Sequence, residues 1–298
     1  MTKEVIDLRS ALELLESIPG QMVHTDVEVD PSAELAGVYR YVGAGGTVAR
    51  PTKTGPAMTF ENVKGHPGAK VVIGLLASRK RVGYLLNSKP EKLGFMMRDA
   101  VKNAIAPVVV DKAKAQCQEV VHLATDEGFD IRKLIPAHTN TPEDAGPYVT
   151  LGMCYASDVE TGESDVTIHR LCLQSKDEIS MFFTPGARHL GEALGKPLPI
   201  SISIGVDPAI EIASCFEPPT TPLGFNELSI AGAIRGKAVE LAPCVTIDEK
   251  CIANAEYVIE GELLVGARVR EDQNSNTGKA MPEFPGYTLP MQNYLLSK

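Results

Sequence analysis

The chain opens with a pattern of leucines that predicts an amphipathic helix. Leu8, Leu12 and Leu15 recur at helical spacing in DLRSALELLESI, residues 7–18. Asp7 stands where an N-cap is expected, and a Pro-Gly pair follows the segment. We therefore predict a helix over 7–18.

Strand-like and helix-like patterns alternate through the rest of the first third. Valine alternates with acidic residues in MVHTDVEVD, as in a half-exposed strand, and VVIGLLA is a short apolar run typical of a buried strand. These patterns predict strands over 22–30 and 71–77, helices over 78–87 and 92–105, and hence a small α/β domain over 1–115.

Two short motifs in this domain are candidates for ligand binding. The glycine-rich VGAGG at 42–46 is followed by Arg50-Pro51 instead of a helix, so we interpret it as a turn in preference to a phosphate-binding loop. The basic run 79–81 begins a predicted helix, and we favour a solvated face over contact with an anion.

From residue 116 onward the chain favours strands separated by Gly, Pro, Asn and Asp. The patterns predict strands over 117–123, 147–157, 165–174, 178–184, 198–206, 238–247 and 255–269, with helices near 186–194, 208–215 and 226–235. Residues 165–174 and 178–183 read as a hairpin joined by SKDE. Many strands with few short helices predict an α+β protein whose second part is an antiparallel barrel.

The amino-acid composition argues against several classes of binding partner and location. The 298 residues include 29 basic and 38 acidic side chains, a net charge of −9, so we expect neither nucleic acid nor a membrane surface as partner. No apolar run reaches the ~20 residues of a membrane span, and the N-terminus lacks the apolar core of a secretory signal. The six cysteines form no CxxC pair, and we expect buried, reduced thiols in a cytoplasmic protein.

Four chemically active residues stand out in the strand-rich part. Asp165, His189 and Glu227 form an oxygen–nitrogen–oxygen set that suits a hard or borderline divalent cation, and Arg170 suits a carboxylate or phosphate. Taken alone, such an Asp–Arg pair is more often a surface ion pair, and a single histidine more often a core residue. The spacing itself is therefore a weak signal.

The blocks around these residues resemble the UbiD-type decarboxylases that use prenylated flavin mononucleotide (prenylated FMN). The resemblance is carried by ENVKGHPGAKVVIGLLASRKR, DVTIHR, RHLG, GVDPAI, NELSIAGAIRG and EYVIEGEL. Within that family, GVYRYVGAGGTV, TNTPEDAGPY, FEPPTTP and GKAMPEFPGY are similar to the gallate and protocatechuate decarboxylase branch. The resemblance runs from the first helix to Tyr287.

The resemblance implies a small N-terminal α/β domain (1–115), a split β-barrel flavin-binding domain (116–287) and a divergent tail (288–298). It implies Asp165, His189 and Glu227 as ligands of Mn²⁺ or a similar divalent cation, with K⁺ nearby. The implied cofactor-binding set is Asp165, Ile168, His169, Arg170, Arg188, His189 and Glu227. Many relatives carry asparagine at Asp165, and spacing alone would leave His169 structural.

For catalysis, the resemblance implies Arg170 as the group that orients the substrate carboxylate and Glu283 as the proton donor. Relatives carry a second glutamate where this chain has Gly278, and Glu271 or Asp272 remain as alternatives. Asp165 and Arg170, five residues apart, would lie about 16 Å apart on opposite faces of a regular strand. We therefore expect a bulge, a strong twist or long side-chain reach between them.

The implied activity is a non-oxidative decarboxylation of a hydroxylated aromatic acid, with reversibility left open. A flavin prenyltransferase would supply the cofactor, and we expect a homo-oligomer because the usual C-terminal domain has no counterpart after Tyr287. The same gap leaves a catalytically silent cofactor-binding or assembly subunit as the alternative. A conventional flavin reductase that shares only the barrel is a third hypothesis.

Overall fold

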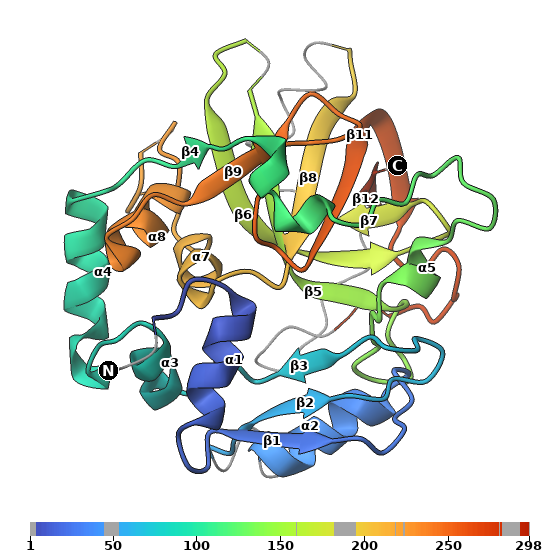
Figure 1. Cartoon of the computed structure of the whole chain (residues 1–298). Coiled ribbons are helices and arrows are strands. Elements are labelled where there is room, and N and C mark those ends of the chain that lie inside the picture. The colour runs from blue at the N-terminus through green and yellow to red at the C-terminus, as the bar shows by residue number, and fades with distance from the viewer. Residues whose placement is uncertain are drawn as a thin grey trace.

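The computed structural model describes residues 4–44, 54–158, 160–181, 195–217, 219–222, 224–279, 281 and 293–297. The fold is α+β: a small α/β layer at the N-terminus lies against a second part that contains a closed barrel (Figure 1). Among the described residues, no helix is both long and apolar enough to cross a bilayer.

A three-stranded sheet with helices on its sides forms the N-terminal layer. The strands run in the order β1-β2-β3, with β2 parallel to β1 and antiparallel to β3. Its elements are α1 (Leu8–Glu16), β1 (Met22–Thr25), α2 (Glu34–Ala44), β2 (Ala57–Phe60), β3 (Val71–Ile73), α3 (Arg79–Leu85), η1 (Pro90–Lys92) and α4 (Leu93–Lys102). Leu35 of α2 packs on Met58 and Phe60 of β2, whereas α1 packs with α3 through Leu15 and Leu85.

A closed antiparallel barrel forms the second part, with strand order β11-β12-β7-β6-β5-β8 in the described chain. A small sheet β10-β9-β4 and helices α7 and α8 lie beside it (Figure 1). The elements are β4 (Val108–Val109), η2 (Lys112–Lys114), η3 (Gln116–Gln118), α5 (Ile131–Leu134), β5 (Tyr148–Ser157), β6 (Ser164–Leu173), β7 (Ile179–Met181), β8 (Leu198–Ile204), α7 (Pro208–Ala213), α8 (Leu228–Arg235), β9 (Glu240–Pro243), β10 (Lys250–Ile252), β11 (Tyr257–Arg270) and β12 (Asn293–Ser297).

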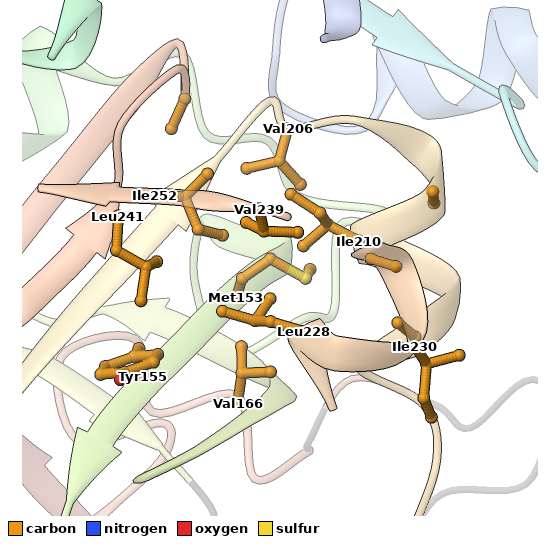
Figure 2. Packing of buried hydrophobic residues seen from close by; sticks show 14 of the residues in the cluster. Met153, Tyr155, Val166, Val206, Ile210, Leu228, Ile230, Val239, Leu241 and Ile252 are labelled. Atoms are coloured by element: carbon orange, nitrogen blue, oxygen red, sulfur yellow. The ribbon is translucent and has the colours of Figure 1, made fainter. Parts of the chain in front are cut away.

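The largest apolar core joins the outside of the barrel to α7 and α8. In Figure 2, Met153 of β5 and Val166 of β6 meet Leu228 of α8, and Ile210 of α7 lies beside them. Leu93 and Ala100 of α4 belong to the same cluster. Residues 93–109 therefore pack with the barrel side, because α4 contacts α8 and β4 pairs with β9.

Several sequence predictions need correction. Residues 117–123 form no strand: η3 covers Gln116–Gln118, and Val120 and Val121 face solvent. The predicted buried strand 71–77 is a three-residue, half-exposed edge strand. Helix α2 was missed, and the VGAGG motif, predicted as a turn, begins inside it; residues 45 and 46 lie outside the described residues.

Two predictions about single side chains were also wrong. Arg81 is buried, with 1% of its surface exposed, because its guanidinium donates to the carbonyls of Gly74 and Gly55. Cys215 is exposed, since it follows the last turn of α7, whereas Cys172 is buried as expected.

The segment 288–298, predicted as a divergent tail outside the barrel domain, contains one of the barrel strands. Asn293–Ser297 form β12, which pairs with Arg270 and its neighbours in β11 on one side and with β7 on the other. A strand between two others is fixed by backbone hydrogen bonds, which leave little trace in the residue pattern. The divergent tail therefore takes part in closing the barrel.

Candidate functional site

Asp165 and Glu227 form a pair of adjacent carboxyl groups. Asp165 lies in β6 and faces solvent, and Glu227 lies immediately before α8 with 4% of its surface exposed. Burial, followed by the neighbouring Asp165 carboxyl, raises the pKa of Glu227 to about 8. Oε2 of Glu227 is buried without a hydrogen-bond partner in the described chain. Such an unsatisfied buried acid is costly unless something binds it.

Asn226 holds this pair together. Its Nδ2 donates to Oγ of Ser164 at 2.8 Å, at the start of β6, and its Oδ1 accepts from the backbone N–H of Leu228 at 3.0 Å. One side chain thereby fixes the first turn of α8 and ties it to the strand that carries Asp165. This explains why the NELSIAGAIRG and DVTIHR blocks place their acids side by side.

The other end of α8 is tied to α7 by a buried ion pair. The guanidinium of Arg235 contacts the carboxylate of Asp207 with two nitrogens, Nε at 2.7 Å. Asp207 also caps α7 by accepting from the N–H of Ala209, and Arg235 donates to the carbonyl of Leu85 at 2.9 Å. The GVDPAI and AIRG blocks thus orient α8 relative to the N-terminal layer.

A second buried pair lies further along β6. Arg170 donates from Nη2 to Oε2 of Glu271 at 3.1 Å, and from Nη1 to the carbonyl of Met281 at 2.8 Å. Only 1% of the Glu271 side chain and 13% of the Arg170 side chain are exposed. The pair is therefore charge-assisted and largely removed from solvent, which strengthens its electrostatic interaction.

The surroundings of Glu271 fix its orientation. Its carbonyl accepts from Nε2 of Gln174 at 2.6 Å, which anchors the segment after β11 to the barrel. Tyr148 is buried beside it, and burial, together with Cys172 and Glu271, raises the pKa of the phenol above its ordinary value. An arginine, a carboxyl group and a neutral phenol therefore converge at one place.

Sequence reasoning left Glu271 and Asp272 as alternatives for the missing second acid. The carboxylate of Asp272 accepts instead from Arg270, at 2.9 and 3.1 Å, and from the N–H of Gly278 at 2.6 Å. Only Glu271 of these two contacts Arg170. Spacing could not decide this, because the turn after β11 sets which acid faces the barrel.

The expected irregularity between Asp165 and Arg170 is present in the neighbouring strand. The pairing of β5 with β6 shifts register between Val149, opposite Leu171, and Gly152, opposite His169. An extra residue in β5 therefore lies across from Arg170. Such a bulge bends β5 and increases the local twist, whereas β6 itself pairs in unbroken register from Asp165 to His169.

The remaining cofactor-binding predictions fall partly on described residues. Ile168 packs against the core shared with α8. His169 in β6 has its pKa lowered to about 4 by burial, opposed by the charge of Asp165, so its imidazole is neutral near pH 7. Arg188, His189 and Glu283 lie outside the described residues. Within the described chain, no three-residue group of His, Cys, Asp and Glu could hold a metal ion.

Two family models match the chain in succession. The first is the 3-octaprenyl-4-hydroxybenzoate carboxy-lyase N-terminal domain, over residues 12–101, and the second is the Rift-related domain of the same enzyme, over 108–295. The chain belongs to the UbiD family. The predicted fold and family resemblance are thereby confirmed.

Two decarboxylases are similar to this chain over most of its length. Gallate decarboxylase of Lactiplantibacillus plantarum is 54% identical over an alignment of 293 residues, which covers 96% of this chain and 60% of that protein. The apo 3,4-dihydroxybenzoic acid decarboxylase AroY of Klebsiella pneumoniae is 53% identical, with a TM-score of 0.93 over 99% of this chain and 62% of that one.

A more distant structure contains prenylated FMN. The UbiD-class enzyme HmfF of Pelotomaculum thermopropionicum, in complex with prenylated FMN, matches with a TM-score of 0.85 at 32% identity. The match covers 98% of this chain and 64% of that chain. This UbiD-family chain therefore spans about three fifths of the length of these relatives.

Proposed function

We propose that the chain is the catalytic part of a non-oxidative decarboxylase that acts on a hydroxylated aromatic acid and uses prenylated FMN. The observation that carries the proposal is the pair Arg170–Glu271, buried at 3.1 Å in a barrel of the UbiD type. The names of the relatives, gallate decarboxylase and 3,4-dihydroxybenzoic acid decarboxylase, support the substrate class.

The carboxyl pair at the start of β6 fits a divalent cation. Glu227 presents a buried oxygen without a partner beside Asp165, and two close acids repel each other when both are ionised. A hard or borderline cation such as Mn²⁺ would offset this repulsion, and carboxylate oxygens suit it. We propose that Asp165 and Glu227, with His189, hold the cation that ties down the phosphate of the flavin, with K⁺ nearby.

Arg170 would act at the other end of the strand. Its guanidinium is fixed by Met281 and Glu271 and offers the planar fork that recognises a carboxylate in two places. It would bind the substrate carboxylate and hold it in the orientation from which carbon dioxide leaves. Prenylated FMN, when bound, supplies the electron sink that protein side chains lack.

Glu271 and Glu283 would have different roles in the reaction. Glu271 would hold the Arg170 side chain in place and compensate the positive charge of its guanidinium. Glu283 remains the predicted donor of the proton that replaces carbon dioxide. The Tyr148 phenol is neutral near pH 7, and burial raises its pKa further, so its hydroxyl can donate a hydrogen bond without adding charge to the site. These roles require the site to exclude water, which the burial of Glu271 and Tyr148 favours.

Carbon dioxide release by the cofactor-loaded protein tests the proposal. The chain would be co-expressed with a flavin prenyltransferase, supplied with Mn²⁺, checked for bound flavin by native mass spectrometry, and assayed with 3,4-dihydroxybenzoate and gallate. We expect Arg170→Ala to reduce release at least about 100-fold. Arg98→Ala is the matched control, since Arg98 pairs with Asp99 on the exposed face of α4. Equal loss in both variants would refute the role of Arg170.

A second candidate function follows from the length of the match. Because the chain spans about 60% of gallate decarboxylase, binding of the cofactor without turnover is an alternative. Adding the C-terminal part of that relative as a separate polypeptide distinguishes the two. Turnover by the chain alone supports the leading proposal, and turnover only after the addition supports the alternative.

We also propose that the protein is a homo-oligomer in the cytoplasm, where a flavin prenyltransferase supplies its cofactor. All six cysteines are free, as expected in a reducing compartment.

A further inference from the structure

Three thiols gather at one place away from the proposed active site. Sγ of Cys117 lies 3.9 Å from Sγ of Cys251, and the thiol of Cys244 also interacts with that of Cys251. Cys117 is in η3, Cys244 directly follows β9, and Cys251 is in β10. Residues more than 120 positions apart are thus in contact only because the small sheet brings them together.

The sheet geometry fixes Cys251 at the centre. Cys251 is paired with Ala242 in the β9–β10 ladder, so Cys244, two residues beyond Ala242, lies on the same face. On the other side, the N–H of Cys117 donates to the carbonyl of Ala253 at 3.2 Å, which holds η3 against the end of β10. Both thiols therefore reach Cys251 from fixed backbone positions.

The thiols of Cys251 and Cys117 differ in their exposure to solvent. Cys251 is completely buried, whereas Cys117 is partly exposed. Hydrogen bonds from the thiols of Cys117 and Cys244 lower the pKa of Cys251, and the same interactions raise the pKa of those two partners. Cys251 is accordingly the best internal nucleophile of the three, and Cys117 is the thiol that a solute can reach.

The surroundings favour a bond between thiols over a metal site. The buried neighbours Ala115, Ala242 and Ala253 are small and apolar, and no three-residue metal-binding group is found in the described part of the chain. The 3.9 Å between Sγ of Cys117 and Sγ of Cys251 must shorten to the ~2.05 Å of a disulfide bond, so the two side chains must move toward each other.

We propose that Cys117 and Cys251 form a reversible disulfide by exchange with a small-molecule disulfide. In the first step the Cys117 sulfur attacks the small disulfide as its proton passes to the hydrogen-bonded Cys251 sulfur, which forms a mixed disulfide at Cys117 and releases one small thiolate. In the second, the Cys251 thiolate attacks Sγ of Cys117 and expels the second small thiol. Two protein thiols are oxidised to one disulfide while the small disulfide is reduced to two thiols, and the two thiol protons pass to the released thiolates.

The bridge would clamp the segment between the N-terminal layer and the barrel. It would join η3, which follows β4, to β10, and so fix the small sheet against the connecting chain. Its formation needs neither the flavin nor the substrate. The inference therefore stands or falls independently of the proposed decarboxylase.

Trypsin separates the three thiols onto different peptides, which makes the pairing directly readable. Cleavage after lysine and arginine places Cys117 in 115–132, Cys244 in 238–250 and Cys251 in 251–268. The protein would carry Cys215→Ser, which removes the exposed thiol. It would be incubated in its native state with glutathione disulfide, and the remaining free thiols would be blocked with iodoacetamide. The protein would then be digested with trypsin without reduction, and the peptides mapped by mass spectrometry. We expect a cross-linked pair of 115–132 with 251–268.

Thermal unfolding gives a second readout. A native bridge that closes so long a loop should raise the melting temperature of the oxidised protein by about 5 °C over the reduced protein. Cys117→Ser, added to the Cys215→Ser protein, should abolish both the cross-link and the shift. A cross-link between 238–250 and 251–268, or glutathione adducts alone, would overturn the assigned pair, whichever result the decarboxylase assay gives.

Discussion

At the scale of single residues, two consecutive acids after β11 have different roles. Glu271 faces the barrel and contacts Arg170, whereas Asp272 closes its own turn with Arg270 and the N–H of Gly278. Both are almost completely buried, so burial does not distinguish them. The direction of each side chain decides the chemistry.

Substituting these two acids separates catalysis from structure. Glu271→Gln keeps the shape of the side chain but removes the charge that holds Arg170, and we expect decarboxylation to fall about 10²-fold or more. Asp272→Asn is the matched control, with an expected loss of about 1–2 kcal/mol in stability and less than about a tenfold change in rate. Turnover and urea unfolding of both proteins check this. A larger rate loss for Asp272→Asn would reverse the assignment.

Glu211 in α7 is a buried acid that the proposed mechanism does not use. Burial, aided by the nearby Asp207 carboxylate, raises its pKa to about 8, and its Oε2 has no partner in the described chain. The unfolded chain would release this proton near its ordinary pKa of about 4.5. Between these values the unfolded state binds fewer protons than the folded state, so stability falls as pH rises.

Glu211→Gln should therefore flatten the dependence of stability on pH. We expect the wild type to lose on the order of 3 kcal/mol more than the variant between pH 5 and pH 8. Urea unfolding across that range provides the measurement. Parallel curves for the two proteins would show that Glu211 ionises normally in the fold.

At the scale of elements, helices with local signals were predicted best. For α1, the leucine spacing and the cap at Asp7 are both in the sequence, and the structure confirms the cap by a bond from the N–H of Ser10 at 2.7 Å. The predicted helices 78–87 and 92–105 likewise correspond to α3 and α4. The strand predicted at 71–77 is present but shorter, as β3 (Val71–Ile73), whereas the strand predicted at 117–123 is absent, because an apolar run becomes a strand only where a partner strand pairs with it.

Helix α8 shows how packing explains a motif. A Cβ built on Gly232 would lie 2.5 Å from the carbonyl oxygen of Ile105, which follows α4. The glycine therefore permits close approach of two backbones, and the N–H of Ile105 indeed donates to the carbonyl of Ser229 at 2.9 Å.

Gly232→Ala should destabilise the protein by about 1–3 kcal/mol, because the backbone must shift to relieve the overlap. Gly37→Ala in α2 is the control: nothing lies within 4 Å of its added Cβ, and alanine should stabilise that helix by up to about 1 kcal/mol. Chemical unfolding of both variants compares them. Equal stability in the two would contradict the packing argument.

At the scale of the whole molecule, closure of the barrel depends on its last described strand. β12 lies between β11 and β7, so the edges of both are paired. Leu263, Ile179 and Met181 from these strands contribute to the buried cluster inside the barrel. Residues far apart in the chain are thus joined into one core.

Deleting residues 293–298 should open the barrel. The unpaired edges of β7 and β11 and the exposed apolar cluster would promote aggregation, and we expect loss of soluble protein. Deleting Lys298 alone is the control and should leave the yield unchanged. Size-exclusion chromatography and the soluble fraction after expression measure the difference. A soluble, monodisperse protein without 293–298 would show that β12 is dispensable.

The sequence by itself determined the family, the α+β class and most of the local elements. It also singled out Asp165, Arg170 and Glu227, because these residue types stand within blocks that resemble a known family. Only the tertiary structure chose Glu271 as the partner of Arg170 and made β12 part of the barrel. Helical periodicity and caps act over a few residues and are written locally, whereas strand pairing and side-chain direction after a turn depend on chain segments that the fold alone brings together.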